Sequence, residues 1–187
     1  MSTPDDPFER VHEESDDPWD VDSSYERRKR AVTLASLPDE HYGRALEVGC
    51  SVGALAVDLA GRCDHLLAVD ASQNAVDLAT RRTADLDHVD VRRARIPDEW
   101  PDGRFDLVSI SEVGYFLSRR TLAETLVRAR EALTDDGHLL LCHWRHEIVG
   151  WPLDGPDVHE AFLATGARVL VEHREPDFEL HVLARWS

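Results

Sequence analysis

A glycine-containing turn between an apolar strand and a helix constrains the fold of this chain more than any other feature. Residues 45–48 form a short apolar run, Gly49-Cys50-Ser51-Val52-Gly53 follows as the turn, and residues 54–60 are predicted to form a helix. Gly49 lets the backbone turn, and Gly53 lets the helix pack close to the sheet. Such a junction is typical of parallel α/β sheets, in which the peptide groups of the turn can approach a ligand.

Strands and helices alternate through most of the chain. Apolar runs and turn residues predict seven strands, at residues 45–48, 66–69, 89–93, 105–110, 139–144, 168–175 and 179–186. Helices are predicted at residues 24–37, 54–60, 73–84, 118–132 and 156–165, with Ser72 and Ser118 as N-caps and a turn at 135–137. The pattern predicts an α/β, Rossmann-like, doubly wound fold. Its seven-stranded sheet is mostly parallel, has helices on both faces and ends in a C-terminal antiparallel β-hairpin.

Composition separates an acidic start from one folded domain. Residues 1–18 hold seven acids and three prolines and are predicted to be disordered, whereas residues 19–187 form a single domain. The formal net charge of -16 disfavours nucleic acid as a partner. No apolar run suits a signal peptide or a membrane span, so a cytoplasmic location is expected. The three cysteines lack C-x-x-C spacing, and no metal site is expected.

Two acids give the glycine turn a chemical meaning. Asp70 follows Gly49 by 21 residues, at the end of the second predicted strand, where a carboxylate can accept the hydroxyl groups of a ribose. The dinucleotide fingerprint needs a second glycine where this chain has Ser51. Glu47 is not part of that fingerprint, and it suits a ligand with a cationic amino group. The residues therefore favour S-adenosylmethionine over NAD.

The stretch from about Trp19 to His159 resembles class I methyltransferases of the nodulation protein S type. The cofactor runs, Glu47 to Gly53 and Leu67 to Ser72, are shared by class I methyltransferases at large. Ser111-Glu112-Val113 and His143-Trp144-Arg145 are similar to the nodulation protein S subgroup in particular. The resemblance implies transfer of a methyl group from S-adenosylmethionine, with N-methylation of a glucosamine on a chitin-derived oligosaccharide as the implied reaction.

One departure from the class I pattern concerns the position that binds the adenine. Many class I enzymes hold the adenine amino group with an aspartate after the third strand, where this chain has Arg95. Ile96 or backbone groups are therefore expected to hold the adenine. Either Arg28 or Lys29, before the first strand, is expected to pair with the carboxylate of the donor. The full set of predicted cofactor-binding residues is Trp19, Tyr25, Arg28, Glu47, Gly49, Cys50, Ser51, Gly53, Asp70, Ala71, Ser72, Arg95, Ile96, Ser111 and Glu112.

Candidate catalytic residues follow the fourth and fifth predicted strands. Glu112 would orient an amine, take its proton or contact the cofactor, and the alternative is a structural acid. His143 would act as a base near neutral pH, and the alternative is a hydrogen-bonded core histidine. The predicted acceptor contacts are Tyr115, His143, Trp144, Arg145, His146 and His159.

Three functions fit these features. The first is an S-adenosylmethionine-dependent methyltransferase that acts on a small polar amine or sugar. The second is a non-catalytic module that binds the same cofactor, which the intact turn and its two acids disfavour. The third is a nicotinamide-dependent oxidoreductase, which Ser51 disfavours.

Overall fold

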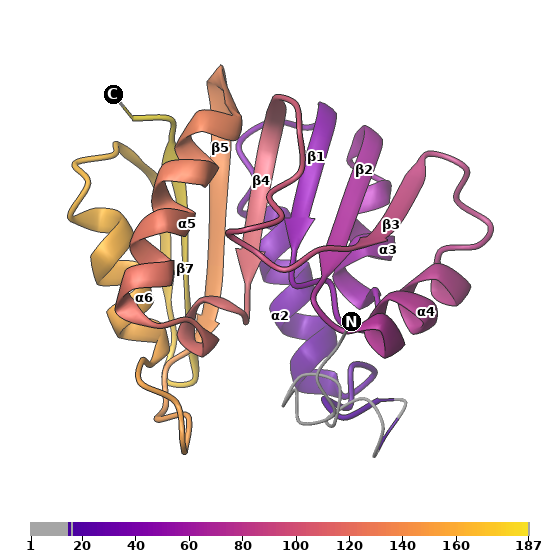
Figure 1. Ribbon diagram of the computed structural model, residues 1–187, viewed down its shortest axis with the longest axis horizontal. Helices are drawn as coiled ribbons and strands as arrows, with labels where there is room; N and C mark the ends of the chain where they lie inside the picture. The colour runs from indigo at the N-terminus through magenta and orange to yellow at the C-terminus, as the bar shows by residue number, and fades with distance from the viewer. Residues whose placement is uncertain (1–14, 16, 187) are drawn as a thin grey trace.

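A seven-stranded sheet with the strand order β3-β2-β1-β4-β5-β7-β6 forms the centre of the molecule (Figure 1). The computed structural model describes residue 15 and residues 17–186. The strands are β1 (Tyr42–Val48), β2 (Cys63–Asp70), β3 (Val89–Arg93), β4 (Phe105–Ser111), β5 (Leu133–Trp144), β6 (Val169–Arg174) and β7 (Phe178–Ala184). Strands β1 to β5 run parallel, and β7 lies antiparallel between β5 and β6. The predicted doubly wound sheet with a closing hairpin is confirmed.

Helices cover both faces of the sheet. The helical elements are α2 (Ser24–Ala35), α3 (Ala54–Ala60), α4 (Gln73–Arg82), the 3-10 helix η1 (Gly114–Phe116), α5 (Arg119–Ala132) and α6 (Gly155–Leu163). Helices α2, α3 and α4 lie on one face, and α5 and α6 lie on the other (Figure 1). Each face buries its own apolar cluster, so the sheet is the middle layer of three.

Local sequence accounts for where the helices begin. The side chains of Ser72 and Ser118 accept hydrogen bonds from the backbone N–H groups of Ala75 and Thr121, which confirms both predicted N-caps. Helix α6 begins with a capping box formed by Asp154 and Asp157. These caps fix the first turns of α4, α5 and α6 next to the carboxyl ends of the parallel strands.

The strand order reverses between β1 and β4, and this reversal creates a crevice. Strands β2 and β3 extend the sheet to one side of β1, whereas β4 and β5 extend it to the other. In doubly wound sheets a ligand binds at such a switch point, outside the carboxyl ends of the strands. The glycine turn and the residues that follow β4 meet at this edge.

One predicted turn is wrong. Residues 135–137 were expected to precede the fifth strand, but β5 already begins at Leu133. Its pairing with β4 shifts register, because Phe105 pairs with Leu133 and Leu107 pairs with His138. The extra residues of β5 form a bulge between these two pairs.

Two further expectations concern the acidic N-terminal segment and membrane-spanning helices. Of the segment predicted to be disordered, residues 1–18, most lies outside the described residues; Ser15, Asp17 and Pro18 are described. The Asp17 carboxylate accepts a hydrogen bond from the Val21 backbone N–H. Among the described residues, no helix combines the length and apolarity that a bilayer crossing requires.

Candidate cofactor and acceptor site

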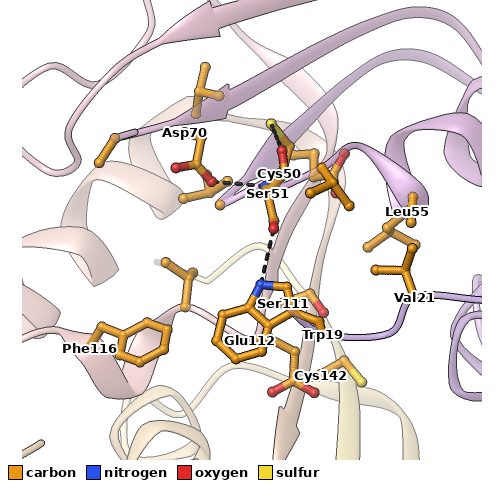
Figure 2. Close-up of a pocket in the computed structure, with 18 of the residues that line it drawn as sticks. Trp19, Val21, Cys50, Ser51, Leu55, Asp70, Ser111, Glu112, Phe116 and Cys142 are labelled. Carbon is orange, nitrogen blue, oxygen red and sulfur yellow. Dashed lines mark hydrogen bonds between the residues drawn. The ribbon is translucent and has the colours of Figure 1, made fainter. Parts of the chain in front are cut away.

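A cavity of about 510 Å³ opens at the carboxyl ends of β1, β2, β4 and β5. Figure 2 shows the glycine turn on one side of this cavity and the end of β4 on the other. Helix α2 and the segment before it supply a third wall. The predicted site residues that line the cavity are Trp19, Glu47, Gly49, Cys50, Ser51, Asp70, Ala71, Arg95, Ile96, Ser111, Glu112, Tyr115 and Trp144.

The glycine turn is held by hydrogen bonds to the end of β2. The backbone N–H groups of Gly49 and Cys50 both donate to the carbonyl oxygen of Val69. The Asp70 carboxylate accepts from the N–H groups of Ser51 and Ser72, each at 2.9 Å. Figure 2 shows the bond from Ser51. These two bonds orient the carboxylate at the end of β2, beside the glycine turn.

Close packing explains the two glycines of the turn. Gly49 has a φ of +77°, and a Cβ atom there would lie 2.8 Å from the Cβ atom of Val113. Gly53 has a φ of +79°, and its Cβ would lie 3.0 Å from the Cα atom of Ala79. Gly53 therefore allows α3 to approach α4, in addition to the sheet packing that was expected.

A Gly53→Ala substitution is expected to destabilise the protein by about 2 to 3 kcal/mol, from left-handed strain together with overpacking. The matched control is Gly166→Ala, because Gly166 has a nearly equal φ of +76° and nothing within 4 Å of its Cβ position. The control is expected to cost only about 1 kcal/mol. Urea unfolding of both variants measures the difference, and equal losses would show that packing against Ala79 contributes nothing.

Glu47 carries a buried carboxyl group with an unsatisfied oxygen. The residue is 2% exposed, lines the cavity, and its Oε2 atom has no hydrogen-bond partner among the described residues. Burial, with smaller contributions from Asp70 and Asp58, raises the pKa of Glu47 to about 8. A cationic group in the cavity would satisfy this oxygen, and the amino group of S-adenosylmethionine fits that requirement.

Trp19 covers the glycine turn from the solvent side. Its indole Nε1–H donates to the Ser51 Oγ atom at 3.2 Å, as Figure 2 shows. The side chain is 48% exposed, so its other edge faces water. The segment before α2 therefore reaches across the cavity to the turn.

Glu112 is an ion-paired carboxylate at the end of β4. It accepts from the Lys29 ammonium at 2.6 Å, the Tyr115 hydroxyl at 2.8 Å and the Trp144 backbone N–H at 2.9 Å. Lys29 also pairs with Glu26 at 2.8 Å. Burial opposes the charge of Glu112, but Lys29, aided by the Trp144 N–H, outweighs it and lowers the pKa. A carboxylate held in this way is a poor proton acceptor, and the arrangement favours its structural alternative over a catalytic base.

His143 lies behind the cavity wall and does not line it. Its side chain is fully buried, and its Nε2 atom accepts from the backbone N–H of Gly114 at 3.2 Å. Its Nδ1 atom lies 3.1 Å from Nε2 of His159. Burial lowers the pKa of His143 to about 4. The geometry again favours the structural alternative, a hydrogen-bonded core histidine.

Several predicted contacts instead meet the turn between β6 and β7. Arg28 forms a two-pronged ion pair with Glu175 at 2.6 and 2.8 Å. Arg145 donates to the backbone carbonyl of Glu175, and His146 pairs with Asp177 at 2.9 Å. The cavity lining does not include these residues; the predicted site residues outside it are Tyr25, Arg28, Gly53, Ser72, His143, Arg145, His146 and His159. Of the two candidates for the donor's carboxylate, Lys29 is the one in the lining.

Sequence reasoning missed the apolar part of the wall. Val113, Phe116 and Leu117 follow β4, and Ile148 lies in the loop after β5. Phe116 also packs edge-on against Trp151, with ring centroids 4.8 Å apart. No chemical signature distinguishes such residues from core residues in a sequence. The only available signal was their place just beyond the end of a parallel strand.

The fold and the cavity define a class. A parallel sheet with this strand order, an antiparallel β7, a glycine turn and an acid at the end of β2 constitute the Rossmann-like fold of class I methyltransferases. The family model for nodulation protein S matches residues 6–153, which is most of the chain. The chain belongs to the nodulation protein S family.

Individual relatives agree with this assignment. Nodulation protein S of Rhizobium tropici is 33% identical over 132 residues, which cover 67% of this chain and 54% of the relative. That of Bradyrhizobium diazoefficiens is 36% identical over 104 residues, covering 54% of this chain and 50% of the relative. The chain thus spans about half the length of these curated relatives.

Two crystal structures are similar to this protein. A Pseudomonas syringae protein, provisionally described as a methyltransferase, is 44% identical with a TM-score of 0.78, covering 87% of this chain and all of that one. The N-methyltransferase NodS of Bradyrhizobium japonicum WM9, in complex with S-adenosylhomocysteine, has a TM-score of 0.87 at 24% identity. That match covers 97% of this chain and all of the other, and it supports the fold.

Proposed function

We propose that this chain is an S-adenosylmethionine-dependent N-methyltransferase whose acceptor is a small amine, with amino sugars as the first class to test. The observation that carries the proposal is the unsatisfied Glu47 carboxylate beside the anchored glycine turn. NodS of Bradyrhizobium japonicum WM9 is an N-methyltransferase, which supports the choice of nitrogen as the acceptor atom.

The residues present fit the cofactor along its length. Glu47 would bind the amino group, Lys29 the carboxylate, and Asp70 the ribose hydroxyls. Ala94, Arg95 and Ile96 line the cavity in one segment and would border the adenine. When bound, S-adenosylmethionine supplies an already activated methyl group.

The transfer end of the cavity favours an amine over a hydroxyl. Glu112, Lys29 and Tyr115 bind one another there, and burial and the Glu112 charge raise the pKa of the Tyr115 hydroxyl well above its usual range. These groups are therefore poorly placed to remove a proton from an alcohol. A neutral amine is nucleophilic without such help, so the chain needs mainly to bind and align it.

Aromatic side chains suit an acceptor with a flat, partly apolar face. Phe116, Trp19 and Trp144 line the cavity around the Glu112 carboxylate (Figure 2 labels Phe116, Trp19 and Glu112). Sugar rings and small cyclic amines present C–H groups that pack on aromatic faces. This wall supports the amino-sugar class without distinguishing it from other cyclic amines.

Calorimetry and a transfer assay test the proposal. S-adenosylmethionine and S-adenosylhomocysteine are expected to bind with 1:1 stoichiometry, and NAD is expected not to bind. Incubation with methyl-labelled S-adenosylmethionine and a panel of amines, with glucosamine oligosaccharides included, is expected to label an amine. A folded protein that binds neither sulfur compound would overturn the proposal. Cofactor binding without transfer to any amine or sugar would favour the non-catalytic module, and NAD binding would favour the oxidoreductase.

A further inference from the structure

Three buried histidines lie in a row behind the acceptor side of the cavity. His143 comes from β5, His159 from α6 and His181 from β7, and each is less than 5% exposed. His143 Nδ1 lies 3.1 Å from His159 Nε2, and His159 Nδ1 lies 2.7 Å from His181 Nδ1. We call these three residues the histidine array. Neither the cofactor nor the acceptor assignment uses it.

Hydrogen-bonding rules assign one tautomer to each ring. The backbone N–H of Gly114 can only donate, so Nε2 of His143 is unprotonated and its proton is on Nδ1. That proton is donated to His159 Nε2, which places the proton of His159 on Nδ1. His159 in turn donates to His181 Nδ1, so His181 carries its proton on Nε2, which faces Glu172 at 4.0 Å.

Charged groups flank both ends of the array, but its rings stay neutral. Near His143 these groups are Glu112 from β4 and Lys29 from α2. Near His181 they are Glu172 and Arg174 from β6 and Glu179 from β7 itself. Burial outweighs these charges and lowers the pKa of all three histidines. A proton added to any ring would break at least one of the hydrogen bonds described above.

Two glycines make room for the His143 ring. A Cβ atom on Gly114 would lie 3.0 Å from its Nε2 atom and 2.6 Å from Val158. A Cβ atom on Gly155 would lie 3.0 Å from the His143 Cβ and would collide with the Trp144 carbonyl oxygen. His143 therefore lies in close contact with both η1 and α6.

We propose that the histidine array positions η1 and, through Tyr115 and Phe116, the acceptor wall of the cavity. Gly114 is the first residue of η1, and Tyr115 packs edge-on against His143 with ring centroids 5.6 Å apart. Tyr115 and Phe116 both line the cavity. His143 is thus a positioning residue. Its Nε2 atom is occupied by an amide N–H, so the array does not carry protons from the cavity.

The tautomers can be tested without any activity. In protein labelled with ¹⁵N-histidine, long-range ¹H–¹⁵N spectra at pH 7 are expected to show the Nδ1–H tautomer for His143 and His159. The Nε2–H tautomer is expected for His181. Single-site variants assign the signals. An Nε2–H tautomer or a doubly protonated ring at His143 would overturn the proposal, whatever the protein's function is.

A pair of conservative substitutions separates the two bonds of His143. Glutamine places its amide near Nε2 and keeps an acceptor for the Gly114 N–H, whereas asparagine reaches only the Nδ1 position. His143→Asn is therefore expected to lose protection of the Gly114 amide against hydrogen exchange, and His143→Gln is expected to keep it. If both variants protect this amide equally, the array does not hold η1.

The kinetic part of the test rests on the proposed function. His143→Asn is expected to raise the acceptor KM about tenfold, equivalent to roughly 1.4 kcal/mol. The Kd for S-adenosylhomocysteine should stay within about twofold, because the glycine turn is untouched. His143→Gln should lie between wild type and His143→Asn, and His65→Gln, at an exposed position, is the control. Equal weakening of cofactor and acceptor binding would reduce His143 to a general structural role and overturn the proposal.

The pH dependence of stability gives a further readout. The folded-state pKa of His143, about 4, lies below the unfolded value of 6.5. The unfolded chain therefore binds more protons between these pH values, and stability is lost as the pH falls from about 6.5 to about 4. His143→Gln removes one such group, so its urea midpoint should fall less steeply over this range than that of wild type. An unchanged slope would contradict a buried neutral His143.

Discussion

Replacing Glu47 with glutamine is expected to weaken the binding of S-adenosylhomocysteine about 100-fold, which corresponds to about 2.7 kcal/mol. The Glu47 carboxylate lines the cavity, and its Oε2 atom lacks a partner among the residues described. An ammonium group of the ligand would supply that partner, and removing one member of a buried charge pair costs about 2 to 5 kcal/mol. Glutamine keeps the size of the side chain but removes its charge. Isothermal titration at pH 8 measures the change.

The same substitution is expected to stabilise the cofactor-free protein at alkaline pH. The pKa of Glu47 is about 8 in the folded protein, compared with an ordinary value of 4.5. Between these pH values the folded state keeps a proton that the unfolded state releases, so stability falls as the pH rises. Glutamine does not titrate. The variant should therefore gain a few kcal/mol over wild type at pH 8 and little at pH 5.

Weaker ligand binding and higher stability in one variant would distinguish a binding carboxylate from a structural one. A structural acid would lose stability on substitution at every pH. The control is Glu124→Gln, which removes a carboxylate from an exposed pair with Arg120 on α5. This control should change neither measurement. Equal ligand affinities for wild type and Glu47→Gln would contradict the assignment of Glu47 to the cofactor.

Local sequence was sufficient to predict which residues meet at the glycine-turn end of the cavity. Glu47 lies on β1, the glycine turn directly follows β1, and Asp70 ends β2. Parallel pairing of β1 with β2 brings these residues together. Their relative positions follow from the fold itself. The acid at the end of β2 and the backbone it holds could therefore be placed from spacing alone.

The acceptor end could not be predicted in the same way. Glu112 and His143 were identified as chemically important, but their partners are distant in sequence: Lys29 is 83 residues from Glu112, and His159 is 16 residues from His143. Whether a carboxylate or an imidazole acts as a base depends on what already binds it. That information appears only when α2 and α6 pack against the sheet. Arg28 shows the same effect, since its partner Glu175 is 147 residues away.

The bulge in β5 has a similar origin. Two aspartates and a glycine at residues 135–137 are typical of a turn, and local propensity predicts one. In the structure β5 continues through them, because it pairs with β4 at Leu133, before them, and with both β4 and β7 from His138, after them. The glycine is needed for packing as well, since a Cβ atom on Gly137 would lie 3.0 Å from the Leu133 side chain. Tertiary pairing thus overrides the local preference.

Replacing Lys29 with methionine is expected to destabilise the protein by about 3 kcal/mol, the lower end of the range for breaking a buried ion pair. The Lys29 ammonium is bound by Glu112 at 2.6 Å and by Glu26 at 2.8 Å, and its side chain is 7% exposed. Its removal leaves two carboxylates close together without a cation. Exposure of the Glu112 side chain to the cavity, at 26%, moderates the cost through water.

Removing Glu112 instead should cost less, about 1 to 2 kcal/mol, because Lys29 keeps its pair with Glu26. The double variant Lys29→Met/Glu112→Gln is expected to be more stable than Lys29→Met alone, with a coupling of about 1 to 3 kcal/mol between the two sites. Urea unfolding at pH 7 measures all four proteins of the cycle. The comparison is Arg120→Met, from an exposed pair on α5, which should cost less than about 1 kcal/mol. Strict additivity of the two substitutions would show that the Lys29–Glu112 ion pair does not couple α2 to the end of β4. Apolar packing alone would then hold α2 against this side of the cavity.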